Sequence, residues 1–116
     1  MTETKQELDA LFADKNAEIR AIYDQLLENL RTFGPVQEEP KKTSIHLVKT
    51  SGFAGVHPRK SFLYLTVRMD RSLQGERIAK SEQVSKNRYH NDVKITSAGE
   101  IDDELIGWLK EAYLLA

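Results

Sequence analysis

The residues of this chain best suited to chemistry are three histidines and a set of arginines and lysines in its middle. The stretch His57-Pro58-Arg59-Lys60 separates two apolar runs, and His90 lies two residues before Asp92. Guanidinium and ammonium groups bind phosphates and carboxylates. Histidines that converge with a carboxylate can instead hold a metal ion. The sequence therefore raises two kinds of site, one for an anion and one for a cation.

The anion site is the interpretation that we favour. Its candidate residues are cations, histidines and one aromatic ring on or beside expected strands: His57, Arg59, Lys60, Tyr64, Arg68, Arg88, His90 and Lys94. Basic residues with interleaved aromatic rings suit nucleic acid, because phosphates take the charge and bases can stack. The predicted partner is thus nucleic acid or another anionic ligand. The competing interpretation is that His57–Lys60 is only a turn and that the charges are solvated.

The charge distribution agrees with an anionic partner. The formal net charge is −1, but residues 41–94 hold twelve Lys or Arg against four Asp or Glu. Residues 1–40 hold four basic against nine acidic residues, and residues 95–116 hold one against five. We therefore expect the middle of the chain to form a basic surface, between two acidic ends.

Two other classes of function stay open. His46 and His90 could share the outward face of a sheet near Asp92, and an acidic helix could supply oxygen ligands, as in a small metal carrier or enzyme. Alternatively, the basic sheet of one copy could meet the acidic helix of another, as in a protein-interaction domain that self-associates. The chain lacks cysteine, a P-loop, G-x-S-x-G and G-x-G-x-x-G. We therefore predict no catalytic residue, no metal ligand and no cofactor.

The composition is that of one soluble domain. A chain of 116 residues with 40% hydrophobic and 30% charged residues can bury a single core. No apolar run approaches the roughly 18 residues of a membrane span, and the polar N-terminus does not read as a secretory signal. The absence of cysteine fits a reducing compartment, so we expect a cytoplasmic protein.

Helices are expected at both ends of the chain. Apolar residues recur with helical period from Ile19 to Phe33, after Asn16 as N-cap and before Gly34-Pro35 as a stop. Residues 8–12 suggest a short first helix, and we expect residues 1–7 to fray. The closing helix is expected to begin at a capping box formed by Ser97 and Glu100.

Strands are expected in between, over residues 44–49, 53–56, 62–69 and 88–96. Residues 70–87 are polar and are expected to form a long loop, with at most a short strand near Gln83-Val84. The fold class is therefore α+β, with helices on one face of a mainly antiparallel sheet of about four strands, and with residues 1–116 as a single domain. The expected core is Leu26, Leu30, Leu65, Val67, Ile95, Leu105, Trp108 and Leu109.

The chain resembles the domain-of-unknown-function family 5655. The segments that carry the resemblance are AEIRAIYDQLLENLRTFGPV, KKTSIHL, FAGVHPRKSFLYL and RYHNDVKITSAGEIDDELIGWLKEAY, which together reach from about residue 10 to 115. More distantly, the chain is similar to the YdhG-like family of small α+β domains. The resemblance implies a helix-flanked antiparallel sheet and supplies no catalytic residue. Members of the first family occur alone or joined to nuclease-like domains, and some are described as predicted transport proteins. Some YdhG-like relatives are described as frataxin-like iron binders.

Overall fold

Over residues 2–116, which the structure describes, the protein combines three α-helices with six β-strands. The computed structural model describes the backbone of residues 2–116 and the side chains from Thr4 onward, so Met1 lies outside the described residues. In chain order the elements are α1 (Thr2–Phe12), α2 (Ala17–Leu30), β1 (Gln37–Pro40), β2 (Ile45–Val48), β3 (Gly52–Pro58), β4 (Leu63–Met69), β5 (Ile78–Ser85), β6 (Arg88–Ile95), a 3-10 turn η1 (Ala98–Glu100) and α3 (Asp103–Leu115).

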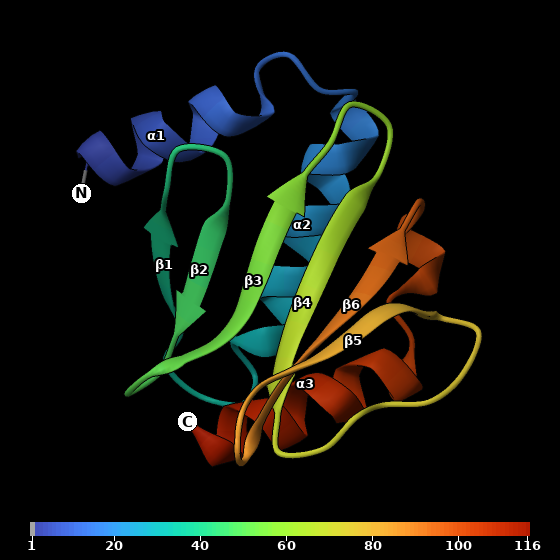
Figure 1. Ribbon diagram of the computed structural model, residues 1–116. Coiled ribbons are helices and arrows are strands. Elements are labelled where there is room, and N and C mark those ends of the chain that lie inside the picture. Colours follow the sequence, from blue (N-terminus) through green and yellow to red (C-terminus); the bar gives the residue numbers. More distant parts are fainter. Residues whose placement is uncertain (1) are drawn as a thin grey trace.

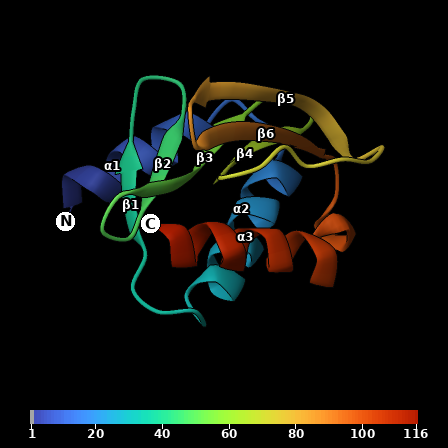
Figure 2. The same cartoon turned by 60° about the horizontal axis from the view of Figure 1, so that its bottom comes forward.

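The six strands form one antiparallel sheet in the order β1-β2-β3-β4-β6-β5. Helices α2 and α3 lie behind this sheet in Figure 1, and the face toward the viewer carries no helix. Figure 2 shows the same layers from another side, with α2 and α3 below the strands and β5 farthest from them. The α+β fold with helices on one sheet face is therefore confirmed. An antiparallel sheet tolerates such an arrangement because its second face can be polar.

The core lies between the sheet and the helices and follows the period-two pattern of β4. Leu63, Leu65, Val67 and Met69 are fully buried, whereas Tyr64 and Arg68 are only partly buried. The other predicted core residues are also fully buried, with one exception. Trp108 is only partly buried at the edge of the core, where its ring lies 5.9 Å from the Arg77 guanidinium. Its large ring spans the boundary between core and solvent.

Two strands are absent from the sequence prediction, and both are sheet edges. β1 lies outside the four predicted strands, and β5 replaces most of the predicted loop over residues 70–87. All of β5 except Ile78 is exposed, so no alternation of apolar and polar residues marks it as a strand. The remaining loop is held by buried Asn91, whose Oδ1 accepts a 2.9 Å hydrogen bond from Leu73 N.

The stretch around His57 also differs from the prediction. His57 and Pro58 are the last residues of β3, and the connection to β4 is formed by residues 59–62. The turn is closed by a 2.8 Å hydrogen bond from Arg59 N to Phe62 O. Proline fits the strand end because it lacks an N–H to donate to a ladder.

The helix starts were predicted only in part. The segment 2–7, for which we expected fraying, belongs to α1. Asn16 occupies the N-cap position of α2, but its side chain makes no capping hydrogen bond. The Ser97–Glu100 capping box is present, yet it heads η1 and not α3. The helix α3 is capped by Asp102, whose Oδ1 accepts a 3.1 Å hydrogen bond from Leu105 N.

Candidate anion-binding surface

The open face is the sheet face without helices, and strand register determines which side chains reach it. Residues paired across antiparallel strands point to the same side. Three rows of paired residues therefore share the open face. They are His46-Gly55-Thr66-Asp92-Lys80, His57-Tyr64-Lys94 and Arg68-His90-Glu82. Five of the eight predicted site residues lie in these rows, so the strand pattern placed them correctly on one surface.

A hollow on the open face, which we call the sheet hollow, has a volume of about 430 Å³. It lies where the start of β5 approaches the end of β3 and the start of β4. Its lining residues are His57, Arg59, Tyr64, Thr66, Ala79, Lys80 and Asp92. Thr66 Oγ1 donates a 2.7 Å hydrogen bond to Asp92. A hollow with this lining presents two cations, a histidine and one hydrogen-bonded carboxylate to a ligand. Its volume lies within the range of small-molecule sites.

Sequence reasoning named three residues of the sheet hollow, His57, Arg59 and Tyr64, as anion ligands. It missed Thr66, because an uncharged residue within the regular alternation of β4 does not stand out as a ligand. It considered Asp92 only as a metal ligand. Lys80 and Ala79 were missed because β5 was expected to be a loop. A polar edge strand gives no local signal, so only strand pairing brings Lys80 opposite Asp92.

Arg68 forms the centre of a second cluster, at the other end of the open face. It pairs with His90 across β4 and β6, and its guanidinium lies beside Gly52, the first residue of β3. A Cβ added at Gly52 would lie only 2.4 Å from Arg68 Nη1, so the glycine leaves room for the guanidinium. Arg68 Nε is buried and has no hydrogen-bond partner among the described residues. Burial, followed by the nearby charge of Arg88, lowers the pKa of Arg68.

The three arginines of the predicted site share an electrostatic property. Within residues 4–116, Arg59, Arg68 and Arg88 have no carboxylate oxygen within 4.0 Å of their side-chain nitrogens. Their positive charges are therefore not neutralised by contact ion pairs. Guanidinium groups in this state have all their outward donors available for a phosphate or carboxylate.

The two lysines of the predicted site lie differently from each other. Lys94 Nζ is 4.5 Å from the centre of the Phe62 ring, and that ring packs edge-on against Tyr64 with centroids 5.1 Å apart. Lys60 belongs to the β3–β4 connection and lines a separate hollow with Lys15 and Lys42, beside α1. Lys60 is therefore not part of the sheet hollow, whereas Lys94 and the two rings form a compact edge of the open face.

The three histidines lie on the open face without converging. Three strand spacings, about 14 Å, separate His46 on β2 from His90 on β6. In the part of the chain that the structure describes, no group of three His, Asp or Glu side chains could hold a metal ion. Burial lowers the pKa of all three histidines; the next cause is Arg68 for His46 and His90, and Arg59 for His57. At neutral pH the positive charge of this face therefore comes from arginine and lysine.

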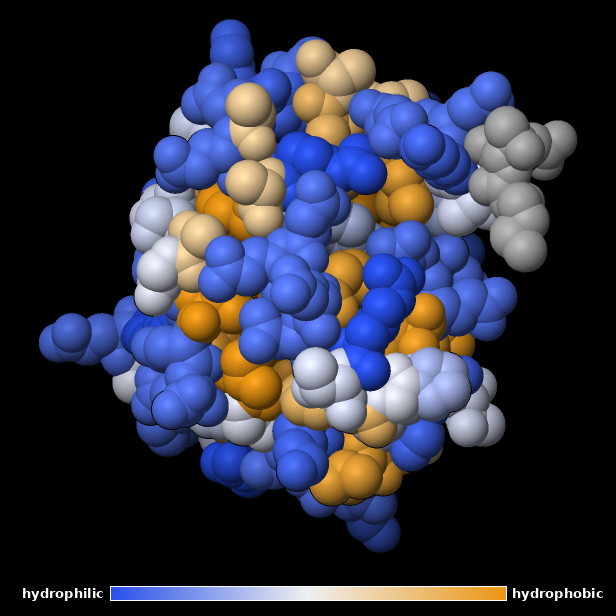
Figure 3. Space-filling model, turned by 180° about the vertical axis from the view of Figure 1, so that it is seen from behind, coloured by the Kyte–Doolittle hydropathy of each residue, from blue (hydrophilic) through white to orange (hydrophobic). Residues whose placement is uncertain are grey.

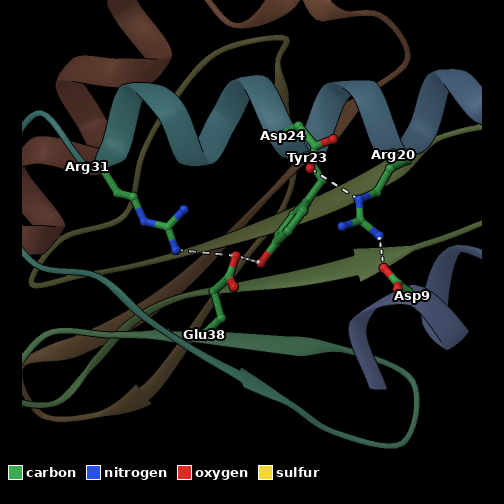
Figure 4. A network of polar contacts seen from close by, with 6 residues as sticks. All are labelled: Asp9, Arg20, Tyr23, Asp24, Arg31 and Glu38. Atoms are coloured by element: carbon green, nitrogen blue, oxygen red, sulfur yellow. Dashed lines mark hydrogen bonds and ion pairs between the residues drawn. The ribbon is translucent and has the colours of Figure 1, made fainter. Parts of the chain in front are cut away.

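The helix side of the molecule carries a larger hollow of different character. It measures about 840 Å³ and lies between α1, α2 and β1. Figure 4 shows its polar groups: Arg20 binds Asp9 and Asp24, and Arg31 approaches Glu38. The Tyr23 hydroxyl donates a 2.9 Å hydrogen bond to the Glu38 carboxylate, and burial, followed by the Glu38 charge, raises the pKa of Tyr23.

Both arginines of this helix-side hollow are paired with carboxylates, so they offer an anion little. In the view from behind, hydrophilic side chains alternate with small apolar patches and no large apolar surface is exposed (Figure 3).

Over the described residues, no helix has the length and apolar character needed to cross a membrane.

Comparison with known proteins identifies the family of this chain and gives no information about its activity. Neither the curated proteins nor the solved structures contained a match to it. A family model described as a domain of unknown function (DUF5655) matches residues 8–116, which include every strand, α2, α3 and the whole open face. Because this match covers nearly the entire sequence, the chain belongs to the DUF5655 family.

Proposed function

We propose that this chain is a small binding domain whose open face holds an anionic ligand, with nucleic acid as the favoured class. One observation carries the proposal: the open face and its rim hold the three arginines that have no carboxylate partner among the described residues. Arg59 stands at the sheet hollow and Arg68 with Arg88 at the opposite end. Such a surface binds phosphates along its length and does not require a single deep pocket.

The aromatic residues favour nucleic acid over an isolated inorganic anion. Tyr64 lines the sheet hollow, and Phe62 packs against it with Lys94 above the ring. Aromatic rings among cations give a base a stacking surface while the cations bind its phosphates. Two carboxylates lie in the paired rows of this face: Asp92 accepts a hydrogen bond from Thr66, and Glu82 forms a 3.6 Å ion pair with Lys80.

Fluorescence anisotropy with a labelled single-stranded oligonucleotide of mixed sequence tests the proposal. At about 50 mM salt we expect binding that weakens as salt rises, because released counterions drive association. Arg68→Glu and Arg88→Glu should each weaken binding at least tenfold, with a shallower dependence on salt. A duplex of the same sequence and free nucleotides show which form of the ligand is preferred.

The matched control is Lys110→Glu, which changes the net charge by the same amount on the exposed side of α3. It should leave binding nearly unchanged. An equal loss for Lys110→Glu would show a nonspecific charge effect and contradict the proposed site. Absence of binding to single strands, duplexes and nucleotides at low salt would overturn the proposal altogether.

A further inference from the structure

We propose that β5 is a self-association edge, at which a second copy of this chain pairs antiparallel about Ser81. β5 is the outermost strand at one side of the sheet, and only β6 pairs with it. It spans Ile78–Ser85 without proline, and residues 79–85 are exposed. Its outer backbone groups are therefore open to another strand, which is the usual hazard of a long edge.

The charges of β5 are arranged so that two antiparallel copies of the strand complement each other about Ser81, because the residue before Ser81 is basic and the residue after it is acidic. In an antiparallel pair centred on this residue, Lys80 of one copy lies opposite Glu82 of the other. The sequence repeats this symmetry farther out, with Ile78 matching Val84 and Glu76 matching Lys86. Those residues lie at or beyond the irregular steps of β5, so the paired contacts of the proposed register are the two between Lys80 and Glu82. Opposite charges directly across two strands are among the contacts that stabilise a sheet.

Side-chain exposure agrees with this pairing. The side chains of Lys80 and Glu82 are 65% and 56% exposed, and their register with β6 puts both on the open face. Val84 is 44% exposed and is one of the few large apolar residues of the described chain that solvent reaches. A partner strand would cover Val84. It would also exchange the ion pair that Lys80 and Glu82 form within one chain, with Nζ and Oε2 3.6 Å apart, for ion pairs between the two copies.

The geometry also limits the strength of the contact. The pairing of β5 with β6 is irregular between Ile78 and Lys80 and again between Gln83 and Ser85. Such irregularities bend a strand and shorten its usable edge. Regular pairing is therefore confined to the centre of β5, and the dimer is weak and reversible, with an interface at the small end of protein contacts.

The symmetry of this pairing has a consequence for the open face. An antiparallel contact between identical strands has its two-fold axis perpendicular to the sheet, so residues that face each other share one side. The open faces of the two copies would then be continuous. The inference itself rests on β5 alone and stands whether or not the open face binds an anion.

Disulfide trapping tests the register, because the natural chain contains no cysteine. A Lys80→Cys variant and a size-tagged Glu82→Cys variant are mixed in a glutathione redox buffer. The proposed register brings these two positions to a Cα separation of about 4.5–5.5 Å, which a disulfide can bridge. Random cross-linking would make half of all cross-linked dimers heterodimers. We expect a fraction well above one half, because position 80 of one copy faces position 82 of the other copy and not position 80.

The matched control is a mixture of Lys80→Cys with Lys86→Cys. Lys86 is also exposed, but it lies four positions away from the proposed register, about 13 Å along the strand. This mixture should show no enrichment of the heterodimer. A heterodimer fraction of half or less for Lys80→Cys with Glu82→Cys, equal enrichment in the control, or no cross-link in either mixture would each overturn the proposal.

Discussion

The seven arginines of this protein divide into two groups that occupy different faces. Arg20, Arg31, Arg71 and Arg77 lie with the helix layer and its loops, and each has a carboxylate partner. The remaining three, Arg59, Arg68 and Arg88, belong to the open face or its rim, and within the described residues they have none. The same residue type thus appears in two electrostatic states.

The paired arginines join secondary-structure elements. Arg20 connects α2 to α1 through Asp9, and Arg71 holds the loop after β4 to Glu111 of α3 with two hydrogen bonds of 3.0 and 3.1 Å. Arg77 binds Asp102, Glu104 and the Glu100 carbonyl, where α3 begins. These contacts give the helix-side arginines a structural role, which the open-face arginines lack.

The contrast between the two faces should be largest for adjacent residues of β4. Leu65 is fully buried beneath the helices, so Leu65→Ala should lower the free energy of unfolding by about 2–5 kcal/mol through the cavity it leaves. Tyr64→Ala, one position earlier on the open face, should cost less than half as much. Chemical denaturation of both variants measures the difference. Equal losses would contradict the assignment of one core face and one open face.

A smaller effect should separate the two groups of arginines. Arg77→Ala should lower the free energy of unfolding by about 1 kcal/mol, because it removes a partly buried ion-pair network at the start of α3. Arg59→Ala removes no contact ion pair and should stay within about 0.5 kcal/mol of the natural protein. The same denaturation measurement distinguishes them, and a reversed order of the two losses would break the comparison.

The open face should also respond to pH in two opposite ways. The pKa values of His46, His57 and His90 are lowered in the folded state, so between those values and about 6.5 the unfolded chain binds more protons. The contribution of these groups to stability is present above about pH 6.5 and is lost as the pH falls. An anionic ligand, in contrast, favours protonated histidine, so its affinity should rise over the same range.

Binding titrations and thermal melts between about pH 7 and 5.5 check both signs, within the range where histidine titrates. Replacing the three histidines with glutamine should flatten both curves. An affinity for the oligonucleotide that falls as the pH is lowered would contradict an anion site on this face.

The smallest effect tests how Arg68 is positioned. In Gly52→Ala the new methyl group would lie 2.4 Å from Arg68 Nη1, so the guanidinium must move. We expect a few-fold weaker affinity for the oligonucleotide and little loss of stability, because the displaced group is the end of a flexible side chain. Gly107→Ala on α3 is the control, since nothing lies within 4 Å of its added Cβ. Equal affinity of both variants would show that the position of Arg68 does not matter for binding.

Much of this protein could be predicted from local patterns in the sequence. The helical period of α2, the alternation of β4 and the turn around Gly34, whose φ is 146°, each depend on neighbouring residues alone. The fold class and seven of the eight core residues followed from these patterns, because a buried face imposes its period directly on the chain. The same alternation placed Tyr64 and Arg68 on the open face.

Other features were decided only by the tertiary structure. β5 has no apolar face to bury, so its existence and the approach of Lys80 to Asp92 depend on pairing with β6. The capping box at Ser97 was predicted, but the N-cap of α3, Asp102, lies five residues later because the intervening turn is a separate 3-10 element. Which arginines have carboxylate partners was likewise invisible in the sequence. Those partners lie up to 40 positions away and meet their arginines only when helices, loops and sheet pack together.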